Sequence, residues 1–89
     1  MKAVVTVVGQ DRTGIIAGVS GYLSDKKINI LDISQTIMQE IFTMIMLVDT
    51  AEMKLEFTDF SDKLKAYGEE RNLKIHVMHE DIFNSMHRI

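Results

Sequence analysis

Residues 2–16 read KAVVTVVGQDRTGII and join a strand pattern directly to the start of a helix. The first eight of these residues are rich in β-branched side chains and stop at Gly9, as a short β-strand does. A polar turn follows, in which Asp11 or Thr13 is expected to cap the next helix by accepting a free backbone N–H. The stretch therefore predicts a strand, a turn and a helix in succession. Apolar side chains recur at helical spacing at Ile15, Val19, Tyr22 and Leu23.

Two further strands are predicted after this helix. Residues 28–38 alternate imperfectly between apolar and polar side chains, and residues 41–49 form a strongly apolar strand pattern. Only Gln39 and Glu40 separate the two runs, which indicates a β-hairpin. Neither residue favours the positive φ of a tight primed turn, so the turn type stays open. The polar side chains that fall on one face of the first run are Asp32, Ser34 and Thr36.

A second helix and a fourth strand complete the pattern. Asn72 is suited to a left-handed stop after the helix, and residues 73–79 then alternate cleanly, as a half-exposed strand does. The apolar face of the second helix is marked by Phe57, Phe60, Leu64 and Tyr67. Residues 81–89 are expected to form a helical tail with one apolar stripe, made of Ile82, Phe83, Met86 and Ile89.

The order of these elements is β-α-β-β-α-β with a terminal helix. Two right-handed crossovers of this length give the split βαβ arrangement, an α+β fold of the ferredoxin-like class. We expect a four-stranded antiparallel sheet in the order 4-1-3-2, with two helices on one face and the second strand at an edge. The expected organisation is one domain, residues 1–80, followed by the tail, residues 81–89.

Composition narrows the classes of function. The chain has 89 residues and a formal net charge of −3, from ten Lys and Arg against thirteen Asp and Glu. A weakly acidic domain argues against nucleic-acid binding by phosphate neutralisation, and charge interrupts the apolar runs too often for a membrane span. The absence of Cys excludes disulfides and thiolate chemistry. The first residues lack the long apolar run of a signal peptide, so we expect a cytoplasmic protein.

Apolar side chains occupy both faces of two predicted strands. In residues 41–49, Ile45 and Leu47 lie on one face, and the other face carries Phe42, Met44, Met46 and Val48. The first strand has Val5 and Val7 on one face and Val4 and Val8 on the other. Exposing the second face would leave a larger apolar patch than monomers usually carry. We therefore expect self-association, as a dimer or a tetramer; the alternative is that the tail helix covers this face.

The turn at residues 9–16 is the strongest candidate binding segment. Free N–H groups, a helix dipole and glycines that allow close approach suit a carboxylate or a phosphate. The structural alternative is a tight turn with a capped helix. Neither a dinucleotide fingerprint nor a P-loop is present. His76 and His79 fall on opposite faces of their strand, so we expect no metal site, and we identify no catalytic constellation.

The same turn resembles the ACT domain family. ACT sequences usually read (D/N)-(R/K)-x-G-(I/L) before the first helix and N-(I/V) at the start of the second strand. Residues 11–15 (DRTGI) and 29–30 (NI) stand at those places, with Thr13 where Pro is frequent. The resemblance covers roughly residues 3–79. It is closest to small stand-alone ACT proteins and extends to formyltetrahydrofolate deformylase and the glycine-cleavage regulatory protein.

The resemblance implies a non-catalytic regulatory module that binds an amino acid or a related metabolite as a homodimer, without a cofactor. In that family two chains pair through edge strands and first helices, and the ligand lies where the first loop of one chain faces the second strand of the other. Carried onto this chain, the loop residues are Gln10, Asp11, Arg12, Gly14 and Ile15. The strand residues are Asn29, Ile30 and Leu31.

Two other functions stay open at this point. A passive dimerisation module, with or without a further protein partner, has the same sequence features. Acylphosphatases share the topology and use an Arg and an Asn, for which Arg12 and Asn29 are the candidates. The loop lacks the G-x-V-Q-G-V run of that family, and Asp11 would repel a phosphate. The enzyme is therefore the weaker alternative.

Overall fold

The computed structural model describes residues 1–10 and 13–86, and its elements follow the predicted order. The strands are β1 (Lys2–Gln10), β2 (Asn29–Met38), β3 (Ile41–Asp49) and β4 (Leu73–His79). The helices are α1 (Ile15–Asp25), α2 (Phe57–Glu69) and α3 (Glu80–Met86). The four strands form one antiparallel sheet in the order β2-β3-β1-β4, which confirms the predicted order and leaves β2 at an edge.

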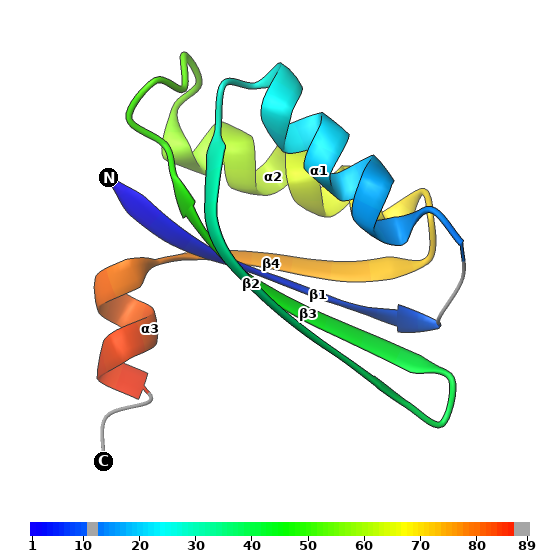
Figure 1. Ribbon diagram of the computed structural model, residues 1–89. Coiled ribbons are helices and arrows are strands. Elements are labelled where there is room, and N and C mark those ends of the chain that lie inside the picture. The colour runs from blue at the N-terminus through cyan, green and yellow to red at the C-terminus, as the bar shows by residue number, and fades with distance from the viewer. Residues whose placement is uncertain (11–12, 87–89) are drawn as a thin grey trace.

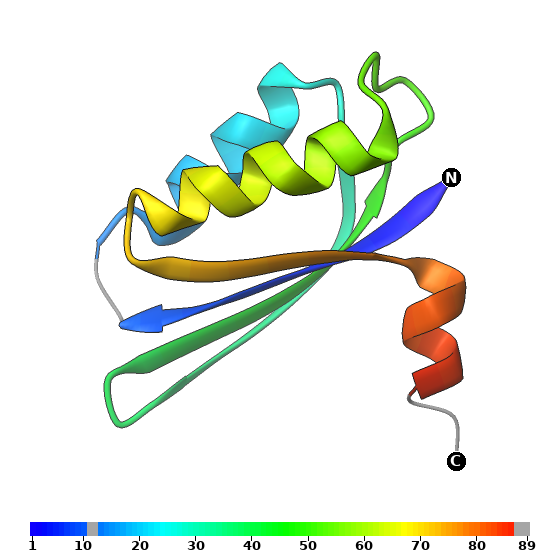
Figure 2. The ribbon, with the colours of Figure 1, turned by 180° about the vertical axis from the view of Figure 1, so that it is seen from behind.

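The sheet separates two unequal layers of helix. Figures 1 and 2 show α1 and α2 together on one face, whereas α3 projects from the end of β4 on the other side. We call the first the helical face and the second the open face. None of the described helices is long and apolar enough to cross a membrane.

The core lies between the sheet and the two long helices. Val5 pairs with Met46 across β1 and β3, and Val7 pairs with Met44, so all four side chains point to the helical face. All four are fully buried. In the predicted apolar faces of α1 and α2, Val19, Leu23, Phe60 and Leu64 are also fully buried and Ile15 is nearly so, whereas Tyr22, Phe57 and Tyr67 are partly buried. The alternation of the strands and the helical spacing thus meet in one apolar cluster.

The hairpin between β2 and β3 turns on two residues that rarely adopt its geometry. Gln39 has φ 48° and Glu40 has φ 71°, so both central residues are left-handed. This is the pattern of a primed hairpin turn, which answers the question that the sequence left open. The hairpin extends past the helical layer (Figure 1), and Ile37 on its helical face is 57% exposed.

The open face is only partly covered. Val4 points to this face and is 4% exposed, because α3 packs beneath it, whereas Met38 at the far end is 68% exposed. The tail helix therefore covers one end of the face and leaves the other bare. The predicted apolar stripe of the tail is wrong in one respect: Phe83 turns toward the sheet, but Ile82 is 55% exposed. Consecutive helical residues point about 100° apart, and in α3 it is Phe83 that takes the side facing the sheet. Ile89 lies outside the described residues.

Gly68 marks the closest approach of α2 to the sheet. A Cβ atom built at Gly68 would lie 2.7 Å from Ile75 Cγ1 and 2.9 Å from the Leu73 carbonyl oxygen. Since Leu73 offers a backbone atom, this contact cannot be relieved by a rotamer change. Gly21 in α1 is the opposite case, because a Cβ there meets nothing within 4 Å.

We expect these two glycines to respond oppositely to substitution by alanine. Gly68→Ala should lower the free energy of unfolding by about 1–3 kcal/mol, the usual cost of overpacking. Gly21→Ala should raise it by about 0.5–1 kcal/mol, because alanine is the better helix former. Urea denaturation of both variants measures the difference. Equal stability of the two variants would contradict the tight packing of α2 on β4.

Candidate functional site

The predicted ligand-binding residues lie at the two ends of α1. Gln10 ends β1, and Gly14 and Ile15 stand at the start of α1, whereas Asn29, Ile30 and Leu31 open β2 beyond its other end. Asp11 and Arg12 lie outside the described residues. The eleven residues of α1 span about 16 Å at 1.5 Å per residue. The structure therefore does not bring the loop and strand residues together within one chain.

The loop end presents an uncapped helix start. Gly14 has φ 94°, a conformation that side-chain-bearing residues rarely adopt, and its carbonyl accepts the Gly18 N–H at 2.9 Å. Among the described residues no side chain caps α1, so the expected cap by Thr13 is wrong, because the chain turns through Gly14 immediately before the helix. The Asp11 alternative lies outside the described residues. No side chain of the described residues therefore occupies the first N–H groups of α1, which are groups of the kind that bind anions.

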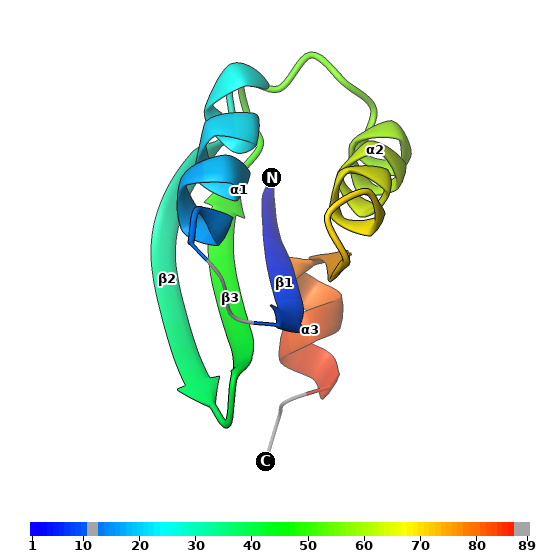
Figure 3. The same cartoon turned by 90° about the vertical axis from the view of Figure 1, so that its right-hand side faces the viewer.

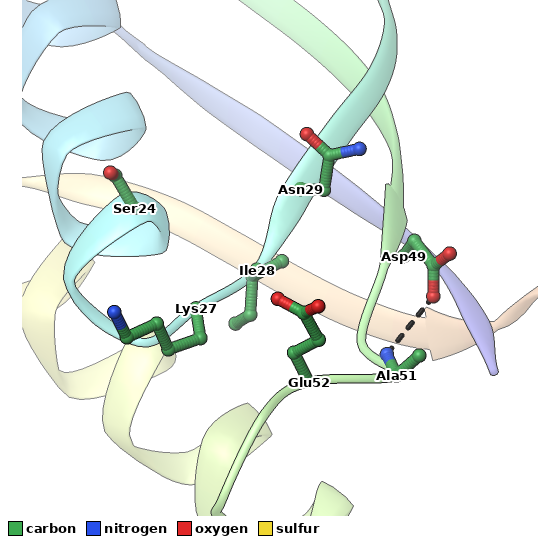
Figure 4. A pocket seen from close by; sticks show the side chains of 7 residues that line it. All are labelled: Ser24, Lys27, Ile28, Asn29, Asp49, Ala51 and Glu52. Carbon is green, nitrogen blue, oxygen red and sulfur yellow. Dashed lines mark hydrogen bonds between the residues drawn. The ribbon is translucent and has the colours of Figure 1, made fainter.

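The strand end opens into a cavity of about 460 Å³. Figure 4 shows its side chains, which come from the end of α1, the start of β2, the end of β3 and the turn after β3. We call it the Asn29 cavity; it is lined by Ser24, Lys27, Ile28, Asn29, Asp49, Ala51 and Glu52. Asn29 and Asp49 are paired directly across β2 and β3, which fixes their side chains on neighbouring strands.

Both signs of charge line the Asn29 cavity. Lys27, in a left-handed conformation with φ 63°, supplies an ammonium on the α1 side. Asp49 and Glu52 supply carboxylates on the β3 side, where Asp49 Oδ1 accepts the Ala51 N–H at 2.9 Å and lies 3.9 Å from the N-terminal ammonium. The Asn29 carboxamide adds a donor and an acceptor. This set of groups can bind a small molecule that carries both an ammonium and a carboxylate.

Sequence reasoning found one polar residue of this cavity and missed the other four. Asn29 was selected by its motif, whereas Ser24, Lys27, Asp49 and Glu52 carry no motif. The pairing of the hairpin was the available signal, because it places the end of β3 beside the start of β2. Ile30 and Leu31 do not line the cavity; Leu31 lies at a break in the β2–β3 register and is exposed.

Two histidines of β4 and one tyrosine of α1 lie outside the Asn29 cavity. His76 is paired with Thr6 and His79 with Ala3, so the two imidazoles point to opposite faces of β4. Among the described residues no cluster of His, Asp and Glu could hold a metal ion. Burial raises the pKa of Tyr22 above its ordinary value where its ring packs at 5.0 Å from that of Tyr67. This contact joins α1 to α2 and lies outside the Asn29 cavity.

Comparisons with known proteins agree with this fold. The model of the ACT domain family matches residues 2–78. A UPF0237 protein of Methanocaldococcus jannaschii is 53% identical over 88 residues, which cover 99% of this chain and 98% of that one. A UPF0237 protein of Clostridium perfringens is also 53% identical, over the full length of both chains.

Solved structures show the same likeness. An ACT domain protein from Streptococcus pneumoniae superposes with a TM-score of 0.83 at 44% identity, covering 93% of each chain. A putative glycine cleavage system transcriptional repressor has a TM-score of 0.74 at 25% identity, covering 89% of this chain and 47% of that one. A formyltetrahydrofolate deformylase from Pseudomonas syringae shares the fold, with a TM-score of 0.79 at 20% identity over 88% of this chain and 27% of its own. The resemblance read from residues 11–15 and 29–30 is confirmed, and the chain belongs to the ACT domain family.

Proposed function

We propose that this protein is a cytoplasmic, non-catalytic regulatory module that binds an amino acid or a related metabolite and acts as a homodimer. The observation that carries the proposal is the Asn29 cavity, in which Lys27, Asp49 and Glu52 line the same space as the motif residue Asn29. An α-amino acid has the complementary pair of charges. Its carboxylate pairs with Lys27, and its ammonium pairs with Asp49 or Glu52.

The geometry of α1 supports a dimer as the complete binding unit. The loop residues and the strand residues lie at opposite ends of a helix, so one chain holds two half-sites. A two-fold axis beside α1 and β2 would place Gly14 of each chain near Asn29 of the other, which gives two equivalent sites in one dimer. The start of α1, which no side chain of residues 1–10 or 13–86 caps, then adds N–H donors for the carboxylate of the ligand.

The exposed edge of the sheet supports the same arrangement. β2 is a ten-residue edge strand whose only charged residue is Asp32, so it lacks the charges and prolines that usually protect such an edge. Ile33 is 40% exposed on the helical face of β2, and Ile16 of α1 and Leu31 are also exposed. The bare end of the open face, with Met38, Ile41 and Val8, is the surface through which two dimers would form a tetramer.

Amino-acid binding is tested by thermal unfolding of the wild-type chain with each common amino acid at millimolar concentration. A ligand at 100 times its dissociation constant should stabilise the protein by about 2.7 kcal/mol, a rise of several degrees in Tm. Lys27→Gln should raise the dissociation constant about tenfold, because it removes a charged hydrogen bond. Lys54→Gln is the matched control, since Lys54 is an exposed lysine outside the cavity.

A second candidate, the passive dimerisation module, predicts a different result. The exposed apolar edge of β2 gives a dimer without any ligand. If no amino acid raises Tm while the mass is that of a dimer, the passive module is correct. If a ligand binds equally to the Lys27→Gln and wild-type proteins, the Asn29 cavity is not its site.

The dimer is tested by introducing a charged side chain into the proposed interface by substitution. Ile33→Glu should shift the mass from dimer to monomer in sedimentation equilibrium, because two buried carboxylates would face each other beside the two-fold axis. The single chain should tolerate this change, since Ile33 is already partly in water. Ile82→Glu on α3 is the control and should keep the dimer mass. A dimeric Ile33→Glu protein would exclude β2 from the interface.

A further inference from the structure

A second cavity lies on the opposite side of the sheet from α1 and α2. It has a volume of about 230 Å³ and lies between α3 and the open face. Figures 2 and 3 show that α3 follows the end of β4 and lies on this side of the sheet. We call it the α3 cavity; it is lined by Val4, Asp32, Ser34, Ile45, Leu47, Glu80, Phe83 and Asn84.

The register of the hairpin directs Asp32 into this cavity. From the Met38–Ile41 pair back to the Asp32–Leu47 pair the two strands are in regular register, so Asp32 shares the open face with Leu47. Ile30 is paired with Val48, so Leu31 is an extra residue in β2, and this bulge shifts the residues before it and not Asp32. The pairing therefore places a carboxylate on a face whose neighbouring side chains, Leu47 and Val4, are apolar.

The α3 cavity has an apolar floor and acidic walls. Val4, Ile45 and Leu47 of the two central strands form the floor, and Phe83 of α3 faces them. Asp32 stands on β2, two strands away from Val4, which corresponds to about 10 Å across the sheet. Glu80, in the first turn of α3, closes the opposite side.

Among the described residues that line this cavity, the charged side chains, Asp32 and Glu80, are of one sign. In the described part of the chain, Asp32 and Glu80 have no ion-pair partner, and Asp32 Oδ1 accepts only the N–H of Ile33, at 2.9 Å. Two unpaired carboxylates attract a cation and repel a second carboxylate. The cavity thus differs from the Asn29 cavity, in which Lys27 offers a partner for an anionic group.

We propose that the α3 cavity binds a free primary amine that carries a short apolar chain. The ammonium pairs with Asp32 and is attracted by Glu80 on the opposite side, and the chain lies on Val4, Leu47 and Phe83. The volume of about 230 Å³ suits a ligand of this class: it exceeds the cavity of about 150 Å³ that holds benzene and falls below the pockets of about 300–1,000 Å³ that hold drug-sized molecules.

Isopentylamine, isopentanol and leucine form a matched set of probes. All three carry the same branched chain; the alcohol lacks the positive charge, and leucine adds a carboxylate. In an NMR titration of the wild-type chain, isopentylamine at millimolar concentration should shift the amide signals of Ser34, Leu47 and Asn84. The alcohol and leucine should leave these signals unchanged. Equal shifts with the alcohol, shifts with leucine, or none with the amine would overturn the proposal.

Substitution of the acidic walls provides the second test. Asp32→Asn and Glu80→Gln should each raise the dissociation constant of isopentylamine about threefold to fivefold, the range for a partly exposed ion pair. Asp62→Asn on the exposed face of α2 is the control and should leave it unchanged. Because Glu80 also favours the first turn of α3 through the helix dipole, Asp32→Asn is the decisive variant. Wild-type affinity in Asp32→Asn would contradict the proposal even if Glu80→Gln binds weakly.

Discussion

The antiparallel pairing of β1 with β3 and β4 is the constraint on which the rest of the structure depends. Val5 and Val7 face Met46 and Met44 on one side, and all of these residues are fully buried. Because side chains alternate along a strand, a slip of one residue would turn this set to the open face and expose it. The same register places Val4 beneath α3 and directs the end of β1 toward the start of α1. The floor of the α3 cavity is therefore a consequence of this alignment, whereas the Asn29 cavity depends on the pairing of β2 with β3.

The sequence was sufficient for the architecture because periodicity and connection length act locally. Strand alternation, the apolar faces of two helices and the two-residue link between β2 and β3 determine the element order, and right-handed crossovers then give the strand order. The bulge at Leu31 was not predictable, since it depends on how β2 fits against β3 and the helices. A regular hairpin counted back from the Met38–Ile41 pair would place Asn29 opposite Thr50, whereas the structure pairs it with Asp49.

The candidate site was predictable only where a motif marked it. Gly14 and Asn29 stood out because the family pattern requires them, and the structure gives Gly14 the left-handed conformation that its place demands. Lys27, which follows Lys26, and Glu52 are charged residues in short connections, a pattern typical of any solvated surface. Only the structure shows that both residues line one cavity, because the end of α1 and the turn after β3 lie side by side (Figure 4). The chemistry of the cavity is thus a property of the fold.

The start of β2 connects the two cavities. Asn29 lines one of them, Asp32 lines the other, and the bulged residue Leu31 lies between them at the exposed edge. Asp32 keeps the register of the hairpin, whereas Asn29 and Ile30 are shifted by the extra residue, so the bulge sets the spacing between Asp32 and Asn29. A single inserted residue in an edge strand therefore determines how the side chains of the two cavities are placed relative to each other.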